Sequence, residues 1–123
     1  MQNKGSDIEE RMLDFTSRIG EVVDALPETR LGRQIANQLI RPGTFPVPKY
    51  SEASAAESRK DFIHKLGIVL KELRETRTWL KLIIKSELLP TEKVALILDE
   101  CEPRGNINGK SLITAKQNLR QSK

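Results

Sequence analysis

The side chains of this sequence best suited to nucleophilic or soft-metal chemistry are one histidine and one cysteine. His64 has no second histidine or cysteine at the spacing that a zinc site requires. Cys101 falls on an apolar helical stripe, where a lone cysteine acts as a small hydrophobic residue rather than as a reactive thiolate. A Cys–His pair would have to join two helices, and no motif supports it. We therefore expect neither a metal site nor a catalytic nucleophile.

Carboxylates in a helical protein raise the alternative of a di-iron centre. The candidate acids are Glu72, Glu75, Glu100 and Glu102. That chemistry needs a Glu-x-x-His motif on each of two helices, and one histidine cannot supply both. We expect these acids instead to pair with Lys71, Arg74 and Arg77 along the helix faces, each pair contributing roughly 0.3–0.5 kcal/mol. The sequence therefore predicts a protein that is not an enzyme and carries no cofactor.

The composition indicates a globular cytoplasmic protein. The chain has 123 residues, of which 37% are hydrophobic and 31% charged, as is typical of one folded domain over residues 1–123. The longest apolar runs have five residues, such as 94–98, whereas a transmembrane helix needs roughly 20. The first residues lack the apolar core of a secretory signal, and a single cysteine cannot form an internal disulfide. We therefore expect a cytoplasmic protein that does not enter a membrane.

Apolar residues at alternating steps of four and three mark helical segments along the chain. The first segment, over residues 6–26, is expected to begin at the capping box Ser6-Asp-Ile-Glu9. Its stripe is Ile8, Met12, Phe15, Ile19, Val22 and Leu26. The second segment, over residues 28–41, follows Pro27, which suits the first turn of a helix. Its stripe is Leu31, Ile35 and Leu39, with the flanking Ala36 and Ile40.

A proline-rich connector separates these segments from two further helices. Pro42-Gly-Thr-Phe-Pro-Val-Pro48 is expected to be extended, because its prolines remove backbone donors and fix φ. The third helix is expected over residues 49–89, and it would be on the order of 60 Å long if unbroken. Its stripe is Phe62, Leu66, Val69, Leu73, Thr76, Leu80 and Ile83. The fourth is expected over residues 91–120 with Thr91 as its N-cap, and a loop over 103–110 stays open as the alternative to one frayed helix.

Narrow apolar stripes and short corners imply an all-α fold, an antiparallel up-down-up-down four-helix bundle. No strand pattern competes with this interpretation. A third helix much longer than its neighbours would leave part of its apolar stripe uncovered, and oligomers bury such stripes. The pattern therefore favours self-association.

The motifs of the chain also resemble those of a known family. In order they are Ile35-Ala-Asn-Gln-Leu-Ile-Arg41, Gly43-Thr44, Tyr50-x-Glu-Ala53, Asp61-Phe-Ile-His-Lys-Leu66, Leu70-Lys-Glu-Leu-Arg-Glu-Thr76, Trp79-Leu80 and Glu100-Cys-Glu102. The set is similar to that of the bacterial four-helix-bundle proteins encoded in 23S rRNA intervening sequences, and it covers most of the chain from Phe15 to about Lys116. The chain departs from the family at Phe45-Pro-Val-Pro-Lys-Tyr50, where relatives carry small residues, and at 103–109, where relatives are more helical.

The resemblance implies a left-handed bundle that assembles as a ring-like homopentamer and binds RNA. Members of the family are also similar to accessory proteins of diversity-generating retroelements, basic pentameric bundles that work with a reverse transcriptase and its RNA. The resemblance brings no catalytic residues, since the family offers none. It implies no structural role in the ribosome either, because the family name reflects where such genes lie.

Basic side chains are the main functional signal from the residues themselves. The net charge is +4, and no acidic residue follows Glu102. The candidate nucleic-acid contacts are Arg33, Arg41, Lys49, Arg104, Lys110, Lys116 and Arg120. Such residues form either a solvated face or a phosphate-binding patch, and five subunits would give a ring of about +20 with a focused field. Few aromatic residues accompany the charge, so binding is expected to follow RNA shape rather than sequence.

The residues expected at a subunit interface are Trp79, Tyr50 and Phe45. Trp79 is one step from the heptad positions, so a place at the edge of the core and a role as an interface anchor both stay open. The sequence thus predicts a non-enzymatic bundle that self-associates and binds structured RNA. The alternative is a protein-interaction scaffold, such as an accessory subunit of a reverse transcriptase or another nucleic-acid enzyme.

Overall fold

The chain forms helices joined by short turns in the part that the computed structural model describes, which is residues 4–44, 46–55 and 58–101. The elements are α1 (Lys4–Ala25), α2 (Arg30–Thr44), α3 (Pro46–Ser54), α4 (Arg59–Lys85) and α5 (Thr91–Glu100). No strand occurs in these ranges. The all-α class expected from the sequence is therefore confirmed.

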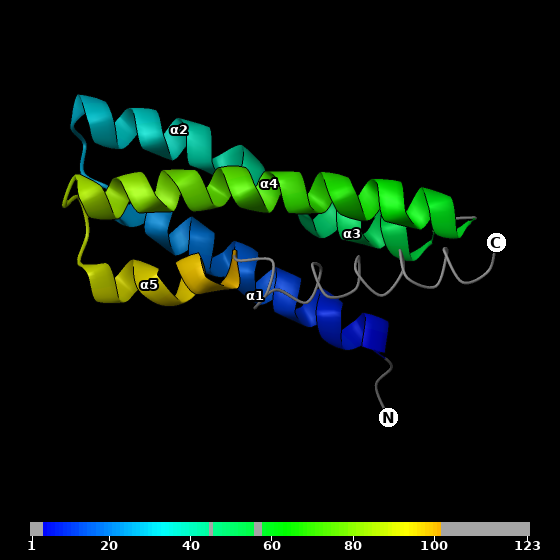
Figure 1. The fold of residues 1–123 in the computed structure, drawn as a ribbon. Coiled ribbons are helices and arrows are strands. Elements are labelled where there is room, and N and C mark those ends of the chain that lie inside the picture. The colour runs from blue at the N-terminus through cyan, green and yellow to red at the C-terminus, as the bar shows by residue number, and fades with distance from the viewer. Residues whose placement is uncertain (1–3, 45, 56–57, 102–123) are drawn as a thin grey trace.

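The helices run alternately in opposite directions (Figure 1). α1 is followed by α2 and α3, which together form the returning arm, and then by α4 and α5. α1 contacts α2, α3 and α5, and α4 likewise contacts α2, α3 and α5. The bundle thus has α2 and α4 side by side on one side and α1 and α5 side by side on the opposite side. This is the predicted antiparallel arrangement, and its left-handedness stays a prediction.

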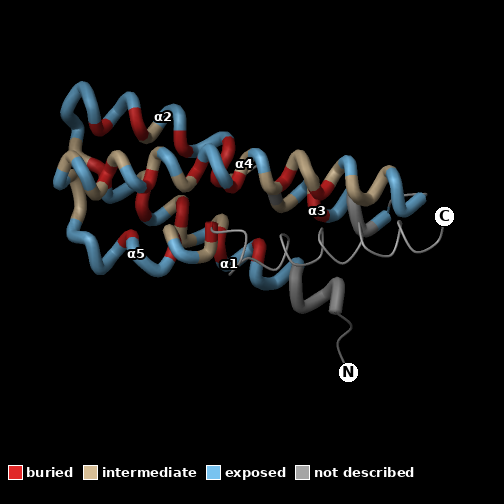
Figure 2. The backbone as a smooth tube through the Cα atoms, in the orientation of Figure 1, coloured by how far each residue is buried: buried red, intermediate tan, exposed pale blue. Residues whose placement is uncertain are grey.

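The helices enclose one continuous apolar core, which appears as the inward-facing red segments in Figure 2. Residues 12–26 bury Met12, Phe15, Ile19, Val22 and Leu26, and α4 buries Leu66, Val69, Leu73, Thr76, Leu80 and Ile83. These positions confirm the four-three spacing as a signal of the core, although Phe62 is only half-buried. Ile8 has a side chain outside the described part of the structure.

The expected stripe of the second helix is wrong at two positions. Leu31 is 42% exposed and Ile40 is 41% exposed, whereas Ile35 and Leu39 are fully buried. Leu31 and Ile40 are nine residues apart, which places them on opposite flanks of a helix with 3.6 residues per turn. The core-facing positions are those of Ile35 and Leu39, and the two flanking side chains point toward solvent.

The expected extended connector over 42–48 is also wrong. α2 continues through Pro42 to Thr44, where the Thr44 hydroxyl donates to the Ile40 carbonyl at 2.7 Å. α3 then begins at Pro46. Prolines are tolerated in the first turn of a helix, because the backbone N–H groups there have no partner within the helix. This accounts for Pro46 and Pro48 in the first turn of α3, whereas Pro42 lies inside α2 close to its C-terminal end. Only residue 45, which the structure does not describe, lies between α2 and α3.

The expected unbroken helix over 49–89 is interrupted after Ser54. Ser58 has an extended backbone, and its side-chain oxygen accepts the Asp61 backbone N–H at 3.1 Å, so it is the N-cap of α4. Serine competes with a continuing helix in this way, because its side chain replaces an internal backbone partner. A signal for helix initiation therefore lies inside the segment that the apolar pattern predicts as one helix.

Several helix ends differ from their predicted positions. α2 begins at Arg30, three residues after Pro27, because the Thr29 hydroxyl caps it by accepting the Gly32 N–H at 3.0 Å. α5 begins at Thr91 itself, with Pro90 as its N-cap and no side-chain cap bond, so Thr91 is not the cap. α1 starts at Lys4, which places the predicted capping residue Ser6 inside the helix.

The fourth predicted helix, over 91–120, is described only as far as Cys101. α5 ends at Glu100, and Cys101 is its C-cap. Cys101 is 3% exposed and belongs to the core cluster, in agreement with its predicted role as a small hydrophobic residue. The alternatives of a loop or a frayed helix at 103–110 lie outside the described residues.

Candidate nucleic-acid interface

Charge is divided unequally between the two sides of the bundle. α2 carries three arginines and no acidic residue, and α4 carries eight lysines and arginines against three acids, so these two helices together have a net charge of +8. α1 carries three bases against six acids and α5 one against three, which gives −5 for that pair. We call the outward surfaces of α2 and α4 the basic side, and those of α1 and α5 the acidic side.

The outer face of α4 carries a line of basic residues, and the exposed Glu75 lies on the flank of this line, four residues after Lys71. Its members are Lys60, His64, Lys71, Arg74, Lys81 and Lys85, all exposed, and we call this set the α4 basic stripe. Their spacing follows the same steps of four and three as the buried stripe, with Gly67 and Thr78 at the two remaining positions. At about 1.5 Å per residue the stripe extends roughly 37 Å along the helix.

The buried and basic stripes of α4 are offset by two residues in the sequence. Two residues correspond to about 200° around a helix, so one stripe faces the core while the other faces away from it. The lysine and arginine stems are therefore held on a rigid element whose inner face is fixed by packing. The same spacing is visible in the sequence, although the predicted nucleic-acid contacts lie at other positions.

The residues predicted to contact nucleic acid have mixed outcomes. Arg33 and Arg41 are exposed on α2, and Arg30 joins them there. Lys49 is half-buried, and its ammonium group lies 3.2 Å from a Glu52 carboxylate oxygen, so it is less available to a phosphate. The other four predicted residues, Arg104, Lys110, Lys116 and Arg120, lie outside the described part of the chain.

Two of the three predicted interface residues, Tyr50 and Trp79, lie in the described part of the chain. Tyr50 is 6% exposed within its own chain, and its interface role stays a prediction. Trp79 is half-buried and packs against the core cluster. Its indole Nε1 is buried without a hydrogen-bond partner among the described residues. Phe45 is outside the described residues.

The residues considered for catalysis lie in separate environments. His64 is exposed on α4, while Cys101 is buried at the end of α5. Glu100 lies 2.8 Å from a guanidinium nitrogen of Arg18 on α1, a partner that was not predicted for it. Within the described ranges, no three histidine, cysteine or carboxylate side chains are grouped as a metal site would require.

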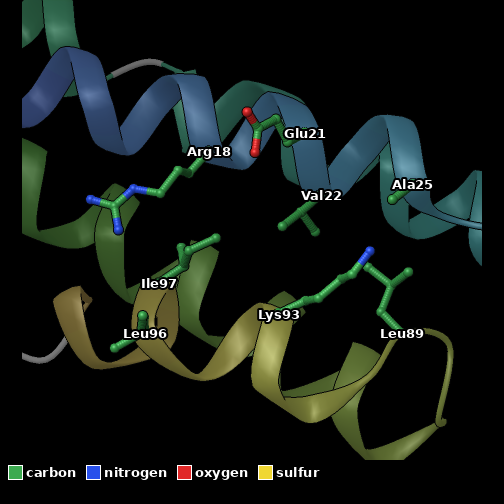
Figure 3. Close-up of a pocket in the computed structure, with 8 residues that line it drawn as sticks. All are labelled: Arg18, Glu21, Val22, Ala25, Leu89, Lys93, Leu96 and Ile97. Atoms are coloured by element: carbon green, nitrogen blue, oxygen red, sulfur yellow. The ribbon is translucent and has the colours of Figure 1, made fainter.

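A groove lies between α1 and α5 on the acidic side (Figure 3). Its volume is about 300 Å³, and its lining consists of Arg18, Glu21, Val22, Ala25, Leu89, Lys93, Leu96 and Ile97. Val22 of α1 and Ile97 of α5 point into the space between the two helices. The walls are thus mostly aliphatic, with charged groups at the rim. No sequence pattern indicated this groove, because it depends on how closely α1 and α5 approach.

No helix in the described ranges combines the length and apolar character that crossing a bilayer requires. A comparison with curated protein sequences finds no match. A model of the 23S rRNA-intervening sequence protein family matches residues 4–109. The chain belongs to this family. The resemblance inferred from the motifs is therefore confirmed.

A solved structure is similar to this chain in both sequence and fold. The chain is similar to the crystal structure of a protein of unknown function from the S23 ribosomal protein family of Bacteroides thetaiotaomicron. The two sequences are 32% identical, the TM-score is 0.78, and the similarity covers 91% of this chain and 99% of the other. The family match includes all five described helices, and thus both the basic and the acidic side.

Proposed function

We propose that this protein is a cytoplasmic, non-enzymatic bundle that assembles into a homopentamer and binds structured RNA through its basic side. The observation that carries the RNA part is the unequal division of charge, with +8 on α2 and α4 against −5 on α1 and α5. A uniform distribution of the same residues would serve only solubility. Separation onto opposite sides produces a surface that attracts polyanions.

The α4 basic stripe is the part of this surface that suits a phosphate backbone best. Five of its members are lysines or arginines, and each that contacts a phosphate releases condensed counterions from the nucleic acid. The ion-paired Lys65, which lies 3.3 Å from Asp61, is not among them. Repeating the stripe in every subunit of a ring would multiply the field at the RNA.

The absence of aromatic residues from the α4 basic stripe indicates whether single-stranded or double-helical RNA suits it. Single-strand readers use exposed aromatic rings on which bases stack. The α4 basic stripe contains no phenylalanine, tyrosine or tryptophan, and the neighbouring Trp79 is half-buried against the core. A row of cations without a stacking platform contacts backbone rather than bases. We therefore propose a structured, double-helical RNA as the ligand.

The test is a binding measurement with matched arginine variants. Arg74→Gln removes one exposed charge from the basic side, and Arg11→Gln removes one exposed charge from α1 on the acidic side. Fluorescence anisotropy with a labelled RNA hairpin at ~50 mM salt should show weaker binding for Arg74→Gln and unchanged binding for Arg11→Gln. Absence of binding by the unmodified protein at this salt, or equal losses for both variants, would contradict the proposal.

The alternative function is that of an accessory subunit of a nucleic-acid enzyme such as a reverse transcriptase. The same basic side would then contact an acidic protein surface. Its signature is a complex with the enzyme that survives nuclease treatment and is lost in the Arg74→Gln variant. If the complex instead disappears on nuclease treatment, RNA is the ligand of the basic side.

A further inference from the structure

The acidic side contains an apolar feature that the described residues of the subunit leave uncovered. Leu96 is 71% exposed at the edge of the groove between α1 and α5, next to the aliphatic lining of Val22 and Ile97. Of the two rim arginine and lysine side chains, Arg18 is matched by Glu100 at 2.8 Å. Glu21 lines the groove on α1, where Asp24 is also exposed, and Lys93 lines it on α5. The α1 wall of the groove therefore suits an apolar side chain that arrives with a cation beside it.

The opposite side of the same protein presents that combination. Leu31 is 42% exposed on α2, and the exposed Arg30 precedes it directly. Leu31 shares one strip of the helix with Gln34, Gln38 and Arg41, all of them exposed, because the steps between them are three, four and three. An apolar residue within a basic and polar strip is thus complementary to an apolar groove within an acidic side.

The two features also lie at the same level of the bundle. The groove is formed by the last two turns of α1 and the first two turns of α5, and Leu31 is in the first turn of α2. All three belong to the end of the bundle where the α1–α2 and α4–α5 turns lie (Figure 1). Copies arranged in parallel around an axis along the helices would therefore bring one copy's Leu31 opposite its neighbour's groove.

We propose that the groove between α1 and α5 binds a second copy of this chain, with Leu31 of that copy's α2 inserted against Val22, Leu96 and Ile97. Arg30 of the entering copy lies beside Glu21 and Asp24, which are exposed on α1, because the other charged residues of the groove lining, Arg18 and Lys93, are themselves basic. The proposal rests on the self-assembly in the proposed function and names the surfaces that carry it. Two α1–α5 sides would not pair with each other, since each has a net charge of −5.

An interface between two different sides of one subunit is heterologous, and it repeats from copy to copy. Such a contact generates a ring when the rotation between neighbours closes and a filament when it does not. The α4 basic stripe takes no part in the contact. The contact uses only the first turn of α2 from the basic side, so the RNA contacts of the α4 basic stripe and the assembly contact use different residues.

Matched leucine and isoleucine variants test the contact first. Leu31→Asp places a charge where the apolar insertion would be, and it should weaken association by about 100-fold or more. Ile40→Asp is the control, because Ile40 lies on the opposite flank of α2 and is 41% exposed, close to the 42% of Leu31. Sedimentation velocity at matched concentrations should show a smaller species for Leu31→Asp only. Equal effects of the two variants would overturn the proposal.

A mixing experiment then tests the two-sided nature of the contact. Leu96→Asp blocks the groove and leaves Leu31 intact, while Leu31→Asp blocks the insertion and leaves the groove intact. Each variant alone should be monomeric, with an unchanged circular dichroism spectrum. An equimolar mixture should give a dimer and nothing larger, because only one productive contact exists between the two variants.

The outcomes separate this proposal from the broader one. Assembly of the unmodified protein that persists in both aspartate variants would show that self-association uses another surface. A monomeric unmodified protein would overturn both the contact and the pentamer. A mixture that stays monomeric although the unmodified protein assembles would refute a heterologous contact. RNA binding by Arg74→Gln and Arg11→Gln is measured independently of all three results.

Discussion

Gly43 of α2 lies so close to Ile19 of α1 that a methyl group on it would be 2.5 Å from the Ile19 Cγ2 atom. Ile19 is fully buried, and the nearby Thr16 hydroxyl donates to the Gly43 carbonyl at 3.4 Å, so the two helices have little room to separate. We expect Gly43→Ala to lower the free energy of unfolding by about 1–3 kcal/mol, because overpacking displaces buried side chains. Urea denaturation followed by circular dichroism measures the loss.

Two other helical glycines provide the controls for this prediction. A methyl group on Gly20 or on Gly67 would meet nothing within 4 Å. Alanine is the better helix former, so Gly20→Ala and Gly67→Ala should each raise the free energy of unfolding by up to about 1 kcal/mol. If Gly43→Ala also stabilised the protein, the close approach of α1 and α2 would be wrong.

The turn after α4 contains a residue in a conformation that favours glycine. Glu87 has φ of 54°, and the N–H of Leu88 donates to the Ile83 carbonyl at 3.1 Å, which completes a Schellman motif. Glu87→Gly should raise the free energy of unfolding by about 1 kcal/mol, because a Cβ atom is strained at positive φ. Thermal unfolding of Glu87→Gly checks this prediction, and Glu87→Ala is the control variant.

The alanine control separates two causes of any gain. Alanine keeps the Cβ atom at position 87 but removes the negative charge, which is unfavourable near a helix C-terminus. Equal stabilisation by alanine and glycine would attribute the effect to charge instead of backbone conformation.

The ion pair between Arg18 and Glu100 joins α1 to α5 beside the groove. The two side chains are each 39% exposed, so solvent screens the 2.8 Å contact. A double-mutant cycle with Arg18→Gln and Glu100→Gln should give a coupling free energy of only about 0.2–1 kcal/mol at low salt. The coupling should decline further at ~500 mM salt. A coupling well above this range that is insensitive to salt would show that the pair is buried in the assembled protein.

The apolar stripes were predictable because they depend on local spacing alone. A residue at Leu73 or Ile19 meets the core whichever helix packs against it, so steps of four and three suffice. The predicted burial of Leu31 and Ile40 was wrong because each lies on the flank of the stripe, where exposure depends on the neighbouring helix. The extended connector predicted from the prolines at 42 and 46 was wrong for a different reason. Their effect depends on whether they fall inside a helix or at its ends, and the sequence leaves this open.

The candidate sites required the fold because they depend on which helices are neighbours. The charge of each helix can be counted in the sequence, yet only the pairing of α2 with α4 turns two basic helices into one side. The groove between α1 and α5 likewise combines residues about 75 positions apart, such as Val22 and Ile97. Local patterns cannot reveal a surface formed by such distant segments.

The α4 basic stripe makes a quantitative prediction about the salt dependence of RNA binding. Lys60 and Lys85 lie at its two ends, so both contact phosphates only if the RNA follows the whole helix. We expect Lys60→Gln and Lys85→Gln each to reduce the slope of log K against log salt by about 0.9 for a duplex, the value for one lost phosphate contact. Lys65→Gln is the control, because Lys65 is half-buried and lies 3.3 Å from Asp61. If only one of the two variants has a smaller slope, the RNA contact is limited to that end of α4. If neither slope changes, the α4 basic stripe is not the RNA contact.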